Sequence, residues 1–189
     1  MKTSGFSARS YACLLYDSEM EGIIAGRTAS DMPGLDIAEQ RSWQNFLDSA
    51  LRMYATLNRA LVDAHHLTLN DVRLLDMLAK SATGSARMGD LADGLMSLPS
   101  RVTRQIRRLE VQGLVRRGAS PDDGRGVLAS ITDEGRVAVA EAMLTYGQGV
   151  RAHFLGRLSR PQIAAMGENC RRISVGLKTD ASPAKLGRV

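Results

Sequence analysis

Residues 97–135 read SLPSRVTRQIRRLEVQGLVRRGASPDDGRGVLASITDEG, and this stretch decides the fold that we predict for the chain. It opens with a helix whose apolar residues recur at the spacing of one buried stripe, namely Val102, Ile106 and Leu109. Pro99 suits the first turn of this helix, and Ser97 is expected to cap it. Gly113 is expected to end it, because glycine tolerates the left-handed conformation of a helix C-terminus.

Two short β-prone runs follow the helix, at 114–117 and 127–132. Between them, residues 121–126 read PDDGRG, which is typical of a tight turn and carries one cation, Arg125. A basic helix followed by a hairpin with a cationic tip is the layout of a winged helix-turn-helix. We therefore interpret this segment as DNA-binding.

The charge of the segment supports that interpretation. Between residues 97 and 125, seven arginines oppose three acidic residues, which places most of the chain's formal net charge of +5 in this segment. Every cation is an arginine, the side chain that forks onto phosphate oxygens or a guanine edge. A solvated helix face remains an alternative for the helix alone, but it does not account for the hairpin.

The same segment resembles the MarR family of bacterial transcriptional regulators. The resemblance is carried by Asp123-x-Arg125-x-x-x-Ala129-x-Ile131-Thr132-x-x-Gly135 and by the preceding Val102-Thr103-Arg104…Leu109-Glu110…Gly113-Leu114-Val115…Arg117. The family usually has Val and Leu at the positions of Ala129 and Ile131, which exchanges one apolar strand residue for another. The resemblance covers roughly residues 43–177. It implies a mainly α fold with a small β-wing, in which a winged helix-turn-helix joins a helical dimerisation region.

Candidate DNA contacts follow from position on the helix. At about 100° per residue, Ser100, Arg104 and Arg107 fall opposite the buried stripe, and Arg101 and Arg108 lie on the flank. Arg101 and Arg104 lie nearest the end that enters the groove, so they are the expected base readers. Ser100 and Thr103 are expected to hold phosphate. The full set of candidate groove and phosphate contacts is Ser100, Arg101, Thr103, Arg104 and Arg108.

Two wing roles rest on the resemblance. It implies that Arg125 enters the minor groove, where arginine favours narrow A·T-rich stretches. It also implies that Asp123 orders the wing by pairing with Arg117 or Arg125, without touching DNA.

The rest of the chain reads as helices around this segment. Thr68 and Asp71 predict a capping box, residues 81–87 a small-residue loop, and residues 88–95 the first helix of the helix-turn-helix. Helices are also expected from 36 to about 65, from 133 to about 158 and from 160 to about 178. Their apolar stripes comprise Trp43, Phe46, Leu47, Ala50, Tyr54, Leu57 and Leu61, then Val137, Ala140, Met143, Leu144 and Val150, then Ile163, Met166, Ile173 and Leu177.

These patterns predict the domain organisation. Residues 67–135 form the winged helix-turn-helix, 36–66 and 136–178 form a helical dimerisation region, and 179–189 form a flexible tail. The small winged domain cannot cover the stripes of the terminal helices, so a second copy of the chain is expected to cover them. Residues 1–35 admit a helix packing on a partner, a mobile arm or a start codon placed too far upstream.

Other functions find little support in the sequence. There is no nucleophile elbow, zinc-protease motif or phosphate loop, so we expect no enzyme, no metal site and no cofactor. Cys13 and Cys170 lie far apart and are expected to be free thiols, although a redox-sensing regulator remains an alternative. No apolar run is long enough to span a bilayer, and a cytoplasmic location is expected.

The expected partners are therefore double-stranded DNA, a second copy of the chain and a small molecule. The resemblance implies release from DNA by a small aromatic or phenolic ligand, without identifying the residues that bind it. A constitutive or architectural DNA binder without an effector remains open, as does a winged module that serves protein partners alone.

Overall fold

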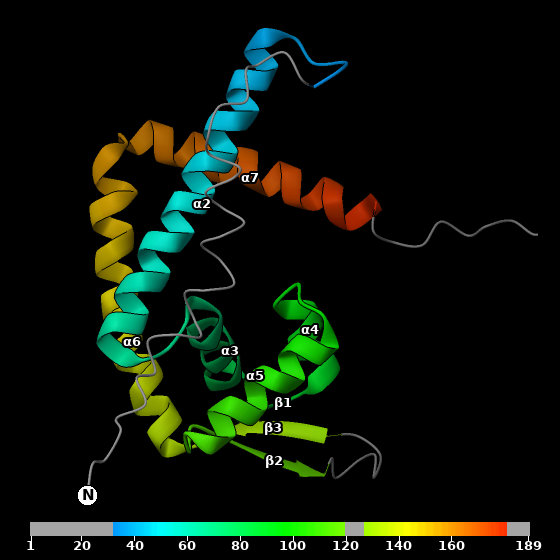
Figure 1. Ribbon diagram of the computed structural model, residues 1–189, viewed down its shortest axis with the longest axis vertical. Helices are drawn as coiled ribbons and strands as arrows, with labels where there is room; N and C mark the ends of the chain where they lie inside the picture. Colours follow the sequence, from blue (N-terminus) through cyan, green and yellow to red (C-terminus); the bar gives the residue numbers. More distant parts are fainter. Residues whose placement is uncertain (1–31, 120–126, 181–189) are drawn as a thin grey trace, which may run out of the picture. The chain divides into compact units, whose positions relative to one another are not determined.

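The computed structural model describes residues 32–119 and 127–180 of the chain (Figure 1). The chain divides into two compact units, one ending at Ala50 and the other beginning at Leu51. The long helix α2 (Ile37–His65) begins in the first unit and continues into the second. None of the described helices is long and apolar enough to cross a lipid bilayer.

The described part of the first unit, residues 32–50, is the start of α2 and the turn before it. Two reciprocal hydrogen bonds cap the helix: the Glu39 N–H donates to the Asp36 carboxylate, and the Asp36 N–H donates to the Glu39 carboxylate, both at 2.9 Å. Trp43 and Phe46 lie one turn apart with ring centroids separated by 5.9 Å, and both remain more than 40% exposed. This part of the helix therefore presents aromatic surface to solvent.

The second unit holds the remaining elements, and their order confirms the predicted winged helix-turn-helix. Figure 1 shows α3, α4 and α5 gathered beside a small sheet. After α2 the chain forms α3 (Leu69–Lys80), β1 (Ser85–Arg87), α4 (Met88–Gly94), α5 (Pro99–Val111), β2 (Val115–Ala119), β3 (Val127–Ile131), α6 (Asp133–His153), a 3₁₀ turn (Leu155–Arg157) and α7 (Arg160–Asp180).

The sheet has three antiparallel strands in the order β1-β3-β2. Ala129 in the middle strand lies opposite Ala86 on one side and Arg117 on the other. The expected hairpin is confirmed, but the prediction of a loop over 81–87 was wrong, since residues 85–87 pair as β1. Three residues are too short to show an alternating pattern, so pairing with β3 decides their conformation.

One apolar core joins the helices to this sheet. Its buried residues come from the α2, α3, α4, α5 and α6 helices and from β2 and β3, while Ala86 of β1 is partly buried and packs against them. Helix α5 contributes three side chains with no exposed surface. The fully buried large apolar side chains are Leu61, Val72, Leu74, Leu75, Leu78, Leu91, Val102, Ile106, Leu109 and Val115.

Helix α6 differs from its predicted bounds and its predicted buried face. It ends at His153, five residues before the expected Leu158, because the chain tightens into a 3₁₀ turn. Val139 and Ala142 are buried, whereas Val137 and Leu144 from the predicted stripe are 60% and 70% exposed. Since the latter two lie seven residues apart, they share one uncovered face of the helix.

Two glycines of α6 give opposite predictions for stability. A Cβ at Gly135 would overlap the Leu114 carbonyl oxygen and lie 2.8 Å from Ile131 Cγ1, whereas a Cβ at Gly147 would meet nothing within 4 Å. Gly135→Ala is therefore expected to lower the free energy of unfolding by about 1–3 kcal/mol through overpacking. Gly147→Ala is expected to raise it by about 0.5–1 kcal/mol through better helix propensity. Urea unfolding of both variants tests the pair, and a stabilised Gly135→Ala would contradict the packing.

Candidate nucleic-acid interface

Helix α5 has one buried face and one cationic face. Val102, Ile106 and Leu109 have no exposed surface, which confirms the predicted stripe. On the other side, the side chains of Arg101 and Arg104 form no hydrogen bond or ion pair with any residue in 32–119 or 127–180. The residues of α5 that lie exposed are Pro99, Ser100, Arg101, Arg104, Arg107, Arg108 and Val111.

The two ends of α5 differ in how they are capped. The cap predicted at Ser97 was wrong: the helix begins at Pro99 with Leu98 as its N-cap, and Leu98 makes no side-chain capping bond. At the other end, Gly113 adopts a left-handed φ of +76°, as predicted. There the Leu114 N–H donates to the Leu109 carbonyl at 2.9 Å, which closes the helix with a glycine C-cap motif.

Of the two expected phosphate-binding hydroxyls, only one is uncommitted in the described structure. Ser100 is exposed in the first turn of α5. Thr103 is half-buried, and its hydroxyl donates to the Pro99 carbonyl one turn earlier, at 2.9 Å. Ser100 is therefore better placed to donate to a phosphate than Thr103.

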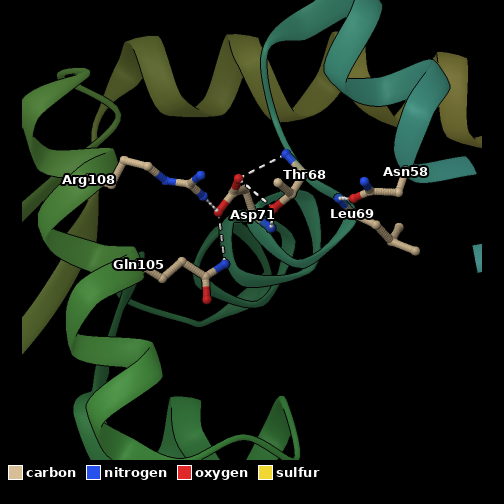
Figure 2. A network of polar contacts seen from close by, with 6 residues as sticks. All are labelled: Asn58, Thr68, Leu69, Asp71, Gln105 and Arg108. Carbon is tan, nitrogen blue, oxygen red and sulfur yellow. Dashed lines mark hydrogen bonds and ion pairs between the residues drawn. The ribbon is translucent and has the colours of Figure 1, made fainter. Parts of the chain in front are cut away.

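A buried carboxylate fixes α5 against α3. Asp71 in the first turn of α3 is 1% exposed, and its Oδ2 accepts from the N–H and the hydroxyl of Thr68 at 2.8 and 2.6 Å. Its Oδ1 accepts from Gln105 Nε2 at 2.9 Å and from the guanidinium of Arg108 (Figure 2). We call these four residues the Asp71 clamp. The capping box at Thr68 was predicted, and the structure confirms it.

A further hydrogen bond next to the Asp71 clamp connects α3 to α2. Asn58 Oδ1 accepts the backbone N–H of Leu69 at 2.9 Å, next to the capping box (Figure 2). Three helices are thus joined by side-chain hydrogen bonds at one point. Together with the apolar stripe, these bonds hold the axis of α5 in one orientation.

Arg108 consequently has a partner inside the protein, which the sequence did not indicate. Its side chain is 49% exposed while one nitrogen is bound to Asp71. Its predicted DNA contact therefore remains a prediction, whereas its contact with α3 is a feature of the structure.

A second ion pair connects α5 to the wing. The Arg117 Nε on β2 donates to Glu110 Oε2 at 2.7 Å, and the Arg117 backbone N–H donates to Oε1 at 3.3 Å. The hydrogen bond from Arg117 lowers the pKa of Glu110 below its ordinary value. Arg117 thus orders the base of the wing through Glu110. Asp123, its predicted partner, and Arg125 at the wing tip both lie outside the described residues.

Sequence reasoning missed three residues of this arrangement: Asp71, as a partner of α5, Gln105 and Glu110. Gln105 and Arg108 lie three residues apart, so both project from the same side of α5 toward α3. That spacing is visible in the sequence. The buried acid that they share becomes apparent only when the two helices are placed together.

Comparisons with known proteins agree with this geometry. The sequence model of the MarR family matches residues 67–127, from two residues before α3 to the first residue of β3. The crystal structure of AbsC, a MarR family transcriptional regulator from Streptomyces coelicolor, has 28% identity and a TM-score of 0.73, and the alignment covers 78% of this chain and 99% of that one.

Two further structures are similar. Sco3205, a MarR family transcriptional regulator from Streptomyces coelicolor solved in complex with DNA, has 31% identity and a TM-score of 0.73 over 76% of this chain and 93% of that one. BpsR of Bordetella bronchiseptica, whose DNA binding is regulated by 6-hydroxynicotinic acid, shares the fold at 22% identity, with a TM-score of 0.63 over 71% of this chain and 98% of that one. Among curated proteins, none has a significant sequence match.

Proposed function

The chain belongs to the MarR family of transcriptional regulators, and from this premise we propose that it is a dimeric, sequence-specific repressor that binds a pseudo-palindromic operator. The observation that carries the proposal is the cationic face of α5. Its arginines at 101 and 104 are exposed and unpaired within the described residues, while the opposite face is fully buried. A helix held so firmly presents its side chains to a groove without a large cost of ordering.

In this proposal some side chains contact base edges and others contact phosphates. Arg101 and Arg104, near the start of α5, contact base edges in the major groove, where arginine forks onto guanine. Ser100 contacts a phosphate, and Thr103 and Arg108 contribute where their internal bonds allow. Arg125 at the wing tip contacts the minor groove.

The proposed dimer is supported by apolar surface on the helices outside the winged domain. Val137 and Leu144 on α6 and Ile173, Val175 and Leu177 on α7 are each more than half exposed. Residues of this kind are common at interfaces between copies of one chain. Two copies would place two α5 helices in successive major grooves, roughly 34 Å apart.

Light scattering at micromolar concentration is expected to give twice the 20.5 kDa mass of one chain. Ile173→Asp and Leu177→Asp are each expected to shift the protein toward the monomer, because burying a charge without a partner opposes association. Val111→Asp is a matched control, since Val111 is also exposed but lies on α5. A monomeric parent protein would contradict the proposed dimer.

The proposed effector is a small aromatic or phenolic molecule that releases the protein from DNA. Its support is the ligand regulation of BpsR, a protein of the same fold. Titration of a preformed protein–DNA complex with a panel of phenolic and heteroaromatic acids tests it. Loss of the complex supports the proposal, and a complex that persists at millimolar concentrations of every compound argues for a constitutive DNA binder.

Selection from a randomised duplex library by the full chain tests the sequence-specific function. We expect an enriched sequence made of two inverted half-sites with centres about 10 base pairs apart. Recovery of unenriched DNA would contradict sequence-specific binding.

A further inference from the structure

The turn before α5 breaks two local rules within three residues. Met96 adopts a left-handed φ of +51°, a conformation that glycine and asparagine favour over methionine. Leu98 occupies the N-cap of α5, where Ser, Thr, Asp or Asn would cap the first turn with a side-chain oxygen. Both side chains are apolar and exposed, Met96 by 84% and Leu98 by 62%.

The backbone of this turn is nevertheless well held. Leu95 on one side and Val102 on the other are buried in the core. The Met96 N–H donates to the Asp93 carbonyl at 3.0 Å, and the Ser97 N–H donates to the Ala92 carbonyl at 2.9 Å. The apolar side chains therefore project from a fixed framework. Local conflicts of this kind concentrate at functional sites.

The position of Leu98 indicates which kind of partner its apolar side chain suits. Leu98 precedes Ser100 and Arg101, at the end of α5 that points into the groove in the proposed function. The apolar area of two exposed side chains is far smaller than the roughly 800 Å² that each partner buries in a stable protein interface. A single apolar side chain beside arginines suits the chemistry of the major groove, because the 5-methyl group of thymine is the apolar part of the base edges there.

We propose that Leu98 contacts the 5-methyl group of one thymine in each half-site and so selects thymine at that position. This inference rests on the proposed DNA-binding function and adds to it a residue that none of the predicted contacts included. Leu98 recognises the methyl group by excluding water between two apolar surfaces. It distinguishes thymine from uracil and cytosine, which lack that group.

The test uses the full chain and the duplex enriched from the randomised library. Each thymine is replaced in turn by uracil, which removes only the methyl group and keeps the base pair. For the parent protein, replacing one particular thymine in each half-site is expected to weaken binding. The affinity should fall about fourfold when one half-site is changed and about 15-fold when both are, which is the effect of losing one buried methyl-sized group per half-site.

Leu98→Ser is the decisive variant. Serine is a better N-cap, so the variant is expected to unfold at the same or a higher urea concentration than the parent. It is also expected to bind thymine and uracil duplexes equally, which a purely structural role for Leu98 would not produce. Val111→Ser is the matched control, because Val111 is 89% exposed at the far end of α5 and should retain the discrimination.

The outcomes distinguish a failure of the proposed DNA-binding function from a failure of the proposed thymine contact. A parent protein that enriches no sequence overturns the proposed function and this inference with it. Three results overturn the inference alone: an enriched site without a sensitive thymine, discrimination retained by Leu98→Ser, or discrimination lost equally in Val111→Ser. If Leu98→Ser binds every duplex as the parent does, the exposed turn serves a different partner, such as a protein.

Discussion

Arg108→Ala is expected to lower the free energy of unfolding by about 2–3 kcal/mol, although the Arg108 side chain is half exposed. The reason is that the substitution leaves the buried carboxylate of Asp71 without its ionic partner. Asp71 is 1% exposed, and without the guanidinium its carboxylate keeps, among residues 32–119 and 127–180, only the hydrogen bonds from Thr68 and Gln105. A buried charge that loses its ionic partner is far more costly than an exposed one.

Urea unfolding of Arg108→Ala and Arg104→Ala checks this expectation. Arg104 lies one turn earlier on the exposed face of α5 and makes no ion pair within the described residues, so its removal should change stability by less than about 0.5 kcal/mol. Asp71→Asn in the Arg108→Ala background removes the stranded charge and is expected to restore about 1 kcal/mol. If Arg108→Ala were as stable as Arg104→Ala, the clamp would contribute nothing to holding α5.

The second large effect concerns DNA. Arg104→Ala is expected to weaken binding to the enriched sequence by about 1–3 kcal/mol per half-site, because a forked contact with a base edge is lost. Arg104→Lys keeps the charge but loses the planar fork, so it should retain affinity for random DNA and lose sequence preference. Competition binding against the randomised library measures both variants.

The control for this experiment is the stability of the folded variant. Because Arg104→Ala is expected to leave stability unchanged, a loss of preference reports on the contact with DNA. If the variant enriched the same sequence as the parent, Arg104 would not read bases and the placement of α5 in the groove would be wrong.

The sequence predicted the parts of the fold that have periodic or capped patterns. The stripe of α5, the capping box at Thr68 and the glycine at the end of α5 each depend on neighbours within one or two helical turns. Such local signals are sufficient to place the helix and its cationic face.

The features that the sequence did not predict depend on contacts between distant segments. The strand β1 forms because β3 lies beside it, 45 residues later for the pair Ser85 and Ser130. The clamp joins Asp71 to Arg108 across 37 residues. The cap at Ser97 was mispredicted because a serine near a first-turn proline suggests a cap, whereas the tight turn at Met96 places Leu98 in that position.

The proposed function requires the cationic face of α5 to bind duplex DNA. The most direct measurement of this binding is the affinity of the parent protein for a duplex carrying the enriched site, taken across a series of salt concentrations. Six or more phosphate contacts across a dimer predict a log–log slope of about −5 or steeper, so affinity should fall about 1,000-fold between 50 and 200 mM salt. A slope near zero would mean that the arginines of α5 are merely solvated, and it would contradict the account.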